Sequence, residues 1–78
     1  MKDTKIKQDS IKIGENIRRV RKNKGLKQVE LVRKLQLCGI DITRESLVKI
    51  ERGVQPIYAT QLKAIKEILE TSYEELLK

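Results

Sequence analysis

Residues 44–52 carry side chains that could form hydrogen bonds with the edges of nucleic-acid bases. Arg44 and Lys49 can donate to guanine O6 and N7, and the carboxylate of Glu45 can accept from cytosine N4. Val48 can contact a thymine methyl group. At about 100° per residue, Glu45 and Lys49 share one helical face, and Arg44 and Val48 share the neighbouring face. A helix that presents them outward could read bases, although most charged helix faces are only solvated.

The same segment has the pattern of a short helix that is anchored on one side. Leu47 and Ile50 are three residues apart and predict an inward face. Thr43 is a suitable N-cap, and Gly53 is a natural helix end. We therefore expect a helix over Arg44–Arg52 whose apolar side packs on a core while its polar side remains free.

Four other helices are predicted from similar patterns. Ile13, Ile17 and Val20 follow the spacing of a first helix over about 10–24, for which Ser10, Asp9 or Thr4 could be the N-cap. The remaining three are expected over about 28–37, over about 58–70, and after Ser72, which forms an S-x-x-E capping box with Glu75. Because no run shows sustained strand alternation, we expect an all-α fold of five helices.

The 78 residues allow one domain, with a net charge of +7 that is unevenly distributed. Residues 1–27 carry +7, residues 28–53 carry +1, and residues 54–78 carry −1. A one-sided basic excess favours a polyanionic partner, although charge also serves solubility. We expect residues 1–10 to be a flexible polar tail and residues 11–78 to be the folded domain.

Several classes of protein are disfavoured by the composition. A single cysteine, Cys38, allows no internal disulfide, and with no histidine the chain lacks the residues of a zinc site. Cys38 is expected to be a small buried residue. Without histidine or a glycine-rich phosphate loop, we expect no enzyme and no cofactor. Two tyrosines make a poor surface for stacking RNA or single-stranded bases.

No apolar stretch approaches the roughly 20 residues that span a bilayer, and the N-terminus lacks an apolar signal-peptide core. We therefore expect no membrane association and a cytoplasmic protein.

The chain resembles the lambda-repressor-like, Cro/repressor-type (XRE-like) helix-turn-helix family in three stretches: IGENIRRVRKNKGLKQVELVRKL, ITRESLVKIERG and TSYEELL. Together they cover about residues 13–77. The resemblance implies a compact five-helix DNA-binding domain whose third helix, at about 44–52, enters the major groove. Three features differ from the family pattern: the link over residues 36–42 is longer than the usual tight turn, Val32 replaces a customary alanine, and Pro56 falls one residue earlier than usual.

The resemblance also implies roles for matching residues. Gln28 matches a glutamine that bonds a backbone phosphate at the start of the second helix. Arg52 and Gln55 match positions that approach phosphate after the third helix. The positions that match base-reading residues are Arg44, Glu45 and Lys49, with Val48 beside them. Arg21 and Glu51 match an arginine–glutamate pair that bridges the first and third helices.

Partners follow from this hypothesis. Two recognition helices must reach half-sites about 34 Å apart, which favours a homodimer on double-stranded DNA. The C-terminal residues Tyr73, Leu76 and Leu77 are candidates for its interface. A chain of this size would act as a transcriptional repressor by occupying its operator. The alternative is an antitoxin or protein-interaction module, because small domains of this family also serve in that way.

Overall fold

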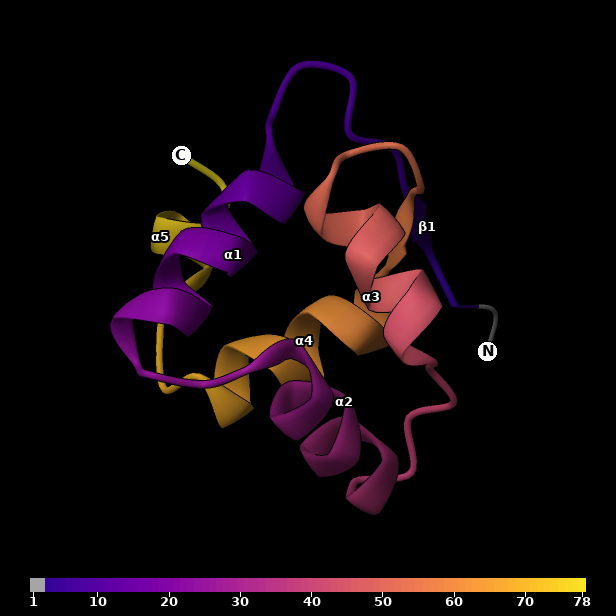
Figure 1. The fold of residues 1–78 in the computed structure, drawn as a ribbon. Helices are drawn as coiled ribbons and strands as arrows, with labels where there is room; N and C mark the ends of the chain where they lie inside the picture. The colour runs from indigo at the N-terminus through magenta and orange to yellow at the C-terminus, as the bar shows by residue number, and fades with distance from the viewer. Residues whose placement is uncertain (1–2) are drawn as a thin grey trace.

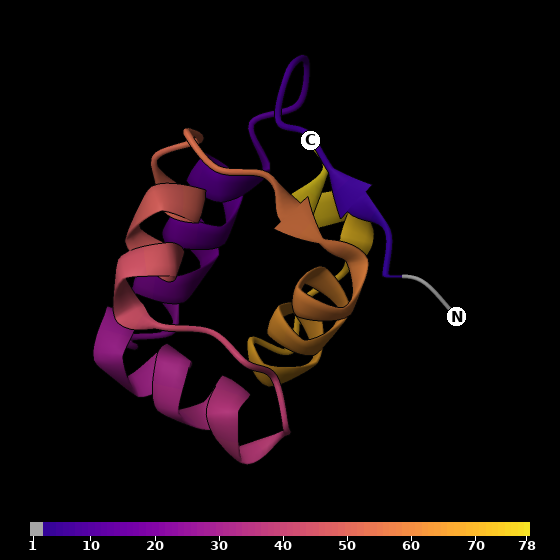
Figure 2. The same cartoon turned by 90° about the vertical axis from the view of Figure 1, so that its right-hand side faces the viewer.

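The computed structural model describes residues 3–78, in which five short helices enclose one apolar core (Figures 1 and 2). The helices are α1 (Ile13–Asn23), α2 (Gln28–Leu37), α3 (Arg44–Glu51), α4 (Ala59–Ile68) and α5 (Tyr73–Leu76). A small antiparallel sheet pairs β1 (Lys5–Ile6) with β2 (Ile57–Tyr58). The mostly helical architecture agrees with the sequence prediction, but the sheet was not predicted.

The core is formed by apolar residues from every helix and from β2. Its buried members are Ile13, Ile17, Val20, Leu31, Val32, Leu35, Ile42, Leu47, Ile50, Ile57, Leu62, Ile65, Leu69 and Leu76. The predicted inward faces of α1 and α3 are therefore correct. Leu76 is fully buried whereas Leu77 is exposed, so the prediction that Leu76 lies on an interface surface is wrong. Its position one turn after Ser72 directs it into the core.

Four helices end in the same backbone motif. After α2, the N–H of Gly39 bonds to Gln36 O and the N–H of Ile40 bonds to Leu35 O, which is a Schellman motif. The motif requires a left-handed residue. Glycine occupies that position after α1, α2 and α3, but Glu70 occupies it after α4 with a φ of 52°. The helix end predicted at Gly53 is therefore correct.

The N-terminal segment is attached to the domain, in contrast to the flexible tail predicted for residues 1–10. Ile6 pairs with Ile57 in the sheet, and Thr4 O accepts from Ala59 N at 2.7 Å. The Asp3 carboxylate accepts from the Thr60 N–H, which belongs to the first turn of α4. The polar composition of this segment suggested a flexible tail. The contacts that attach it are made largely by backbone atoms, so the composition does not reveal them. Residues 1–2 of the predicted tail lie outside the described residues.

The start of α1 also differs from the prediction. The helix begins at Ile13, and Ser10 does not cap it. The side-chain oxygen of Gln8 instead accepts from Gly14 N at 2.7 Å. Gly14 lies against α3, where an added Cβ would fall 1.8 Å from Ile50 O, so α1 and α3 are in direct backbone contact.

Cys38 is exposed, contrary to the prediction of a buried residue, because it follows the last turn of α2 at the surface. Within residues 3–78, none of the helices has the length and apolar character that crossing a membrane requires.

Candidate nucleic-acid interface

The helix α3 is held at a fixed position after α2 by an ordered link. Gln36 Nε2, on α2, donates to Ile42 O at 2.9 Å, and the Ile42 side chain is buried. The next residue, Thr43, accepts from Ser46 N at 3.1 Å and so caps α3 as predicted. The longer link is therefore an ordered connection, and α3 lies beside α2 at the surface of the domain (Figure 1).

The predicted base-contacting residues lie on the outer side of α3. Arg44, Glu45 and Lys49 are exposed, and Val48 is half-buried beside them. The Lys49 ammonium lies 3.4 Å from a Glu45 carboxylate oxygen, and both side chains are at least half exposed. Because this ion pair is solvated, it contributes little stability and can exchange for other hydrogen-bonding partners.

Arg21 and Glu51 are brought together as a buried ion pair between α1 and α3. Arg21 Nε and Nη2 donate to the two carboxylate oxygens of Glu51, at 2.7 and 2.9 Å. Both side chains are almost completely buried. Arg21 Nη1 also donates to Leu26 O at 2.8 Å, in the turn before α2. The pair therefore fixes three elements relative to one another.

Gln28 joins this buried network. Its side-chain Nε2 donates to Glu51 Oε1 at 3.0 Å, so the start of α2 is linked to the end of α3. This bond uses one of the two N–H donors of the Gln28 amide, so the expected bond from Gln28 to phosphate stays a prediction. A phosphate at this point would also be met by the backbone N–H groups of α2.

The residues at the start of α2 line a cleft of about 550 Å³ between α1, α2 and α3. Lys27 N donates to Glu30 Oε1 at 2.9 Å. Among the described residues, no acceptor is bonded to the N–H of Gln28 or Val29. The first N–H groups of a helix carry partial positive charge and attract anions.

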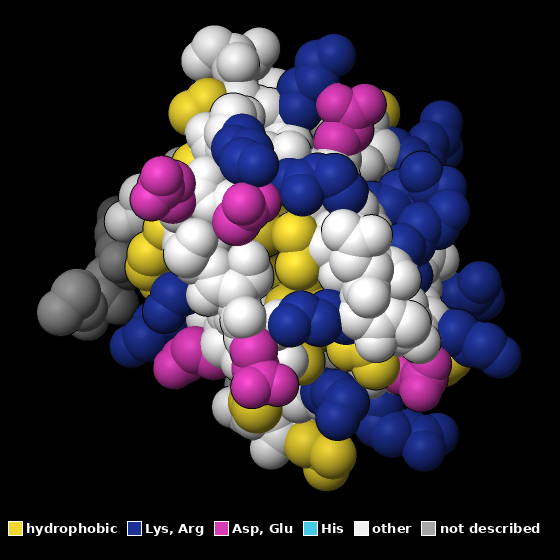
Figure 3. All heavy atoms as spheres, turned by 90° about the vertical axis from the view of Figure 1, so that its left-hand side faces the viewer, with side chains coloured by type: hydrophobic (Ala, Val, Ile, Leu, Met, Phe, Trp, Pro, Cys, Tyr) yellow, Lys and Arg dark blue, Asp and Glu magenta, His cyan; other side chains and the backbone are white. Residues whose placement is uncertain are grey.

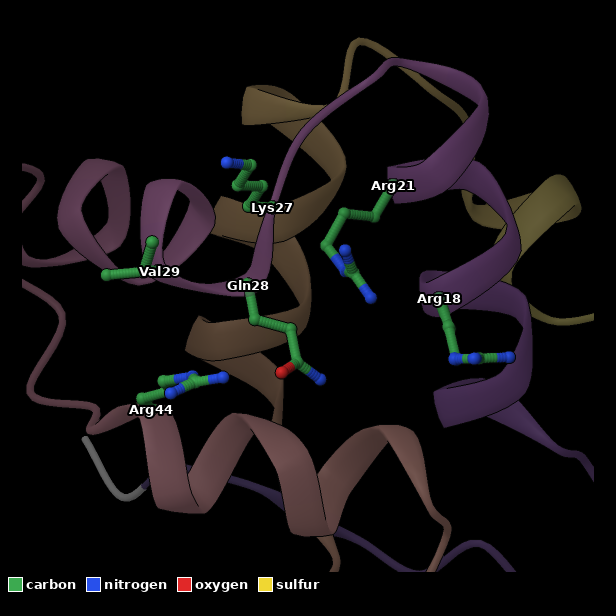
Figure 4. Close-up of a pocket in the computed structure, with 6 residues that line it drawn as sticks. All are labelled: Arg18, Arg21, Lys27, Gln28, Val29 and Arg44. Carbon is green, nitrogen blue, oxygen red and sulfur yellow. The ribbon is translucent and has the colours of Figure 1, made fainter.

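The lining of this cleft is cationic. It is formed by Arg18, Arg21, Lys27, Gln28, Val29 and Arg44, with no carboxylate among them. Figure 4 shows Arg18 on α1 and Arg44 on α3 on opposite sides of Gln28, with Arg21 directed toward the centre. Arg21 is neutralised by Glu51, which leaves Arg18, Lys27 and Arg44 as the other cations of the lining. We call this surface the basic cleft.

The roles of Arg18 and Lys27 were missed from the sequence. Arg18 lies one turn before Arg21, so a search for cations at helical spacing from the buried pair would have found it. Lys27 precedes α2 and shares no helical face with the other residues, so only the folded chain brings it to the cleft.

Arg52 and Gln55 lie apart from the basic cleft, at the C-terminal end of α3. Arg52 is exposed and follows the last residue of the helix. The backbone carbonyl of Gln55 accepts from Gln8 Nε2 at 2.9 Å, and its side chain is half-buried. Both residues belong to the loop over residues 52–56.

Charge is distributed unevenly over the surface. Figure 3 shows Lys and Arg side chains crowded along its right-hand edge, with acidic side chains more frequent toward the centre and left. That edge is the side that faces the viewer in Figure 1. Among the acidic groups elsewhere, Glu75 contacts Arg19 at 3.4 Å and Lys78 at 3.2 Å.

No family model, curated protein or solved structure matches this chain. Within the described residues, no three His, Cys, Asp or Glu side chains are grouped where they could hold a metal ion.

Proposed function

We propose that this domain binds double-stranded DNA in a sequence-specific manner and regulates transcription, with a lambda-repressor-like arrangement of its helices. The observation that carries the proposal is the basic cleft, which combines three unpaired cations with the N-terminus of α2. It lies directly beside α3, whose outer face is polar and free. The surface proposed to contact phosphate is therefore adjacent to the surface proposed to contact bases, as helix-turn-helix recognition requires.

In this mechanism the basic cleft positions the protein on the DNA backbone. Arg18, Lys27 and Arg44 attract a phosphate, and the N–H groups of Gln28 and Val29 bond it. The contact is independent of base sequence. It sets the register in which α3 enters the major groove.

The outer face of α3 then reads the bases. Lys49 donates to guanine, Glu45 accepts from cytosine, and Val48 contacts a thymine methyl group. Arg44 lies at the end of α3 nearest the basic cleft and serves either a base or a phosphate. The buried bonds of Glu51 to Arg21 and Gln28 support this division of roles, because they hold α1, α2 and α3 in one arrangement.

A two-fold homodimer follows from the size of the domain. Its largest extent is 28 Å, whereas successive half-sites on one DNA face are about 34 Å apart. One copy therefore reads one half-site, and two copies read an inverted repeat. The exposed Tyr73 and Leu77 are the remaining C-terminal candidates for the interface. Such a dimer would repress transcription by occupying its operator, in the cytoplasm.

Selection from a random duplex pool at near-physiological salt tests the proposal. The expected result is a two-fold motif with half-sites about one helical turn apart. On the selected duplex, Lys49→Ala should weaken binding by about 1–3 kcal/mol and leave binding to scrambled DNA nearly unchanged. Lys27→Ala, in contrast, should weaken binding to both. Salt-sensitive binding without any motif would refute base reading by α3.

A protein-interaction module is the second candidate, and the exposed Leu37 favours it. This side chain is 81% exposed at the end of α2, beside Val29, Arg33 and Lys34. Leu37 and Val29, which is 52% exposed, line the same hollow, and exposed apolar side chains that lie together are typical of a contact surface. If a partner protein co-purifies with the natively expressed chain, Leu37→Ser should release it while DNA binding persists.

A further inference from the structure

The Gln8 side chain forms hydrogen bonds to three separate parts of the fold. Its oxygen accepts from Gly14 N of α1 at 2.7 Å. Its Nε2 donates to Ile50 O of α3 at 3.0 Å and to Gln55 O of the following loop at 2.9 Å. One amide thus fixes the N-terminal segment against the end of α3, and all of its bonds are to backbone atoms.

Two surface hollows lie on either side of this amide. The first, of about 300 Å³, is lined by Lys5, Lys7, Gln8 and Asp9 together with the loop 53–56. The second, of about 190 Å³, is lined by Lys12, Glu15 and Arg52 with Gln8 and Gly53. The two linings together contain four cations and two carboxylates, and one of these carboxylates, Glu15, lies 4.0 Å from Lys12. Both figures of the fold place the loop that precedes α1 beside the loop that follows α3 (Figures 1 and 2).

We propose that residues 5–12 and 52–56 form a second phosphate-contacting surface, which we call the arm surface, with Gln8 as its positioning residue. This inference rests on the proposed DNA binding. The arm surface would contact the backbone strand that borders the major groove at the C-terminal end of α3. Its ligand is the phosphate backbone of duplex DNA, read without base preference.

The length of α3 supports this placement. Eight residues span about 12 Å, which is close to the roughly 12 Å width of the major groove. A helix of this length that crosses the groove brings its two ends near the two bordering strands. The basic cleft lies at the Arg44 end, and the arm surface lies at the Arg52 end.

The attachment of the segment also favours binding. Lys5 and Lys7 are exposed on either side of Ile6, which packs against the core, and their backbone is fixed by the sheet and by Gln8. Lysines on a fixed segment lose less conformational freedom on binding than those on a free tail. Gln8 thereby holds the segment that carries both lysines against the end of α3 and the loop that follows it.

The test measures how the affinity of the full chain for its selected duplex depends on salt. Each lost phosphate contact lowers the slope of log K against log salt by about 0.9. The variant Lys5→Ala/Lys7→Ala should therefore reduce the magnitude of this slope by about 1.8. A matched control, Lys63→Ala/Lys66→Ala, removes two charges from α4 and should keep the wild-type slope.

Gln8→Ala separates positioning from stability. It leaves every cation in place, yet it should lower the slope toward that of Lys5→Ala/Lys7→Ala, at a temperature where the variant is folded. If Gln8 acted only as a structural residue, its variant would show a lower unfolding midpoint with the wild-type slope.

The outcomes distinguish this inference from the function on which it rests. If the wild-type chain fails to bind duplex DNA, the proposed function and the arm surface are both overturned. If the wild type binds and Lys5→Ala/Lys7→Ala keeps its slope, the arm surface alone is overturned.

Discussion

The basic cleft and the α4–α5 side of the molecule differ in what lies beside cations such as Arg18 and Arg19. Arg18, Lys27 and Arg44 line the cleft together, with no carboxylate among the described residues of its lining. On the other side, Arg19 contacts Glu75, and the Lys66 ammonium lies 5.0 Å from the centre of the Tyr73 ring.

Under the proposed function, this contrast places the anionic partner on the cleft side. Like charges held together destabilise a folded chain, whereas an anion that binds among them recovers that energy. Such departures from local pairing are expected at functional sites. The cleft side also contains the buried pair of Arg21 and Glu51, so the unpaired cations are carried by rigidly connected helices.

The largest expected effect is on stability, and it distinguishes the buried pair from the exposed pairs. Glu51→Leu leaves Arg21 buried without its partner and should lower the free energy of unfolding by about 3–5 kcal/mol. Urea unfolding followed by circular dichroism measures the loss. Glu75→Ala breaks only exposed contacts and should leave the midpoint nearly unchanged.

A double variant provides the control for that experiment. Arg21→Met/Glu51→Leu replaces both charges by apolar side chains and should recover most of the lost stability. Equal losses in the single and the double variant would show that the ion pair stabilises the fold by more than avoiding an unpaired charge.

Neighbouring arginines on α1 test the contrast in DNA binding. Arg18 lines the basic cleft, whereas Arg19 contacts Glu75 near the C-terminus. Arg18→Ala should reduce the slope of log K against log salt by about 0.9, and Arg19→Ala should not. Because both variants lose one positive charge, equal slopes would mean that net charge rather than the cleft determines binding.

A smaller effect is expected at the end of α4. Glu70 has a φ of 52°, which costs a non-glycine residue about 1–2 kcal/mol. Glu70→Gly should relieve part of this backbone strain and raise the free energy of unfolding by about 1 kcal/mol, as measured by urea unfolding. The reverse change, Gly25→Ala, places a Cβ in open space at a φ of 72° and should destabilise by a similar amount. An unchanged Glu70→Gly variant would mean that the strain is offset elsewhere.

The smallest expected effect depends on pH and belongs to the α4–α5 side. The hydrogen bond and charge of Lys78, and then Arg19, hold the pKa of Glu75 below its ordinary value of 4.5. A lowered pKa means that Glu75 stabilises the fold above pH 4.5, and that this contribution disappears as the pH falls through the lowered pKa. Glu75→Gln should therefore show a slightly smaller loss of thermal midpoint on acidification than the wild type. An identical pH profile would show that Glu75 is unpaired in solution.

Much of the helical framework could be predicted because it depends on local chemistry. The bounds of α2, the Thr43 cap and the glycine after α3 agree with the structure, since each is fixed by neighbouring residues. The pairing of Arg21 with Glu51 was expected only from a family resemblance. Periodicity alone gives no reason why these two residues should meet.

The remainder could not be predicted because it depends on contacts between distant segments. The strand β1 has two residues, too few for an alternating pattern, and its partner is more than fifty positions away. Gln8 has no local signature, because all of its bonds are to backbone atoms that only the fold assembles. Likewise, Lys27 reaches the basic cleft through the turn between α1 and α2.

The most direct test of the central claim is an NMR titration of the amide-labelled chain with the selected duplex. The largest shifts should fall on residues 27–29 at the basic cleft and on residues 44–49 of α3, while α4 and α5 change little. Shifts confined to α4 and α5, or no shifts at all, would contradict the assignment of DNA binding to the cleft side.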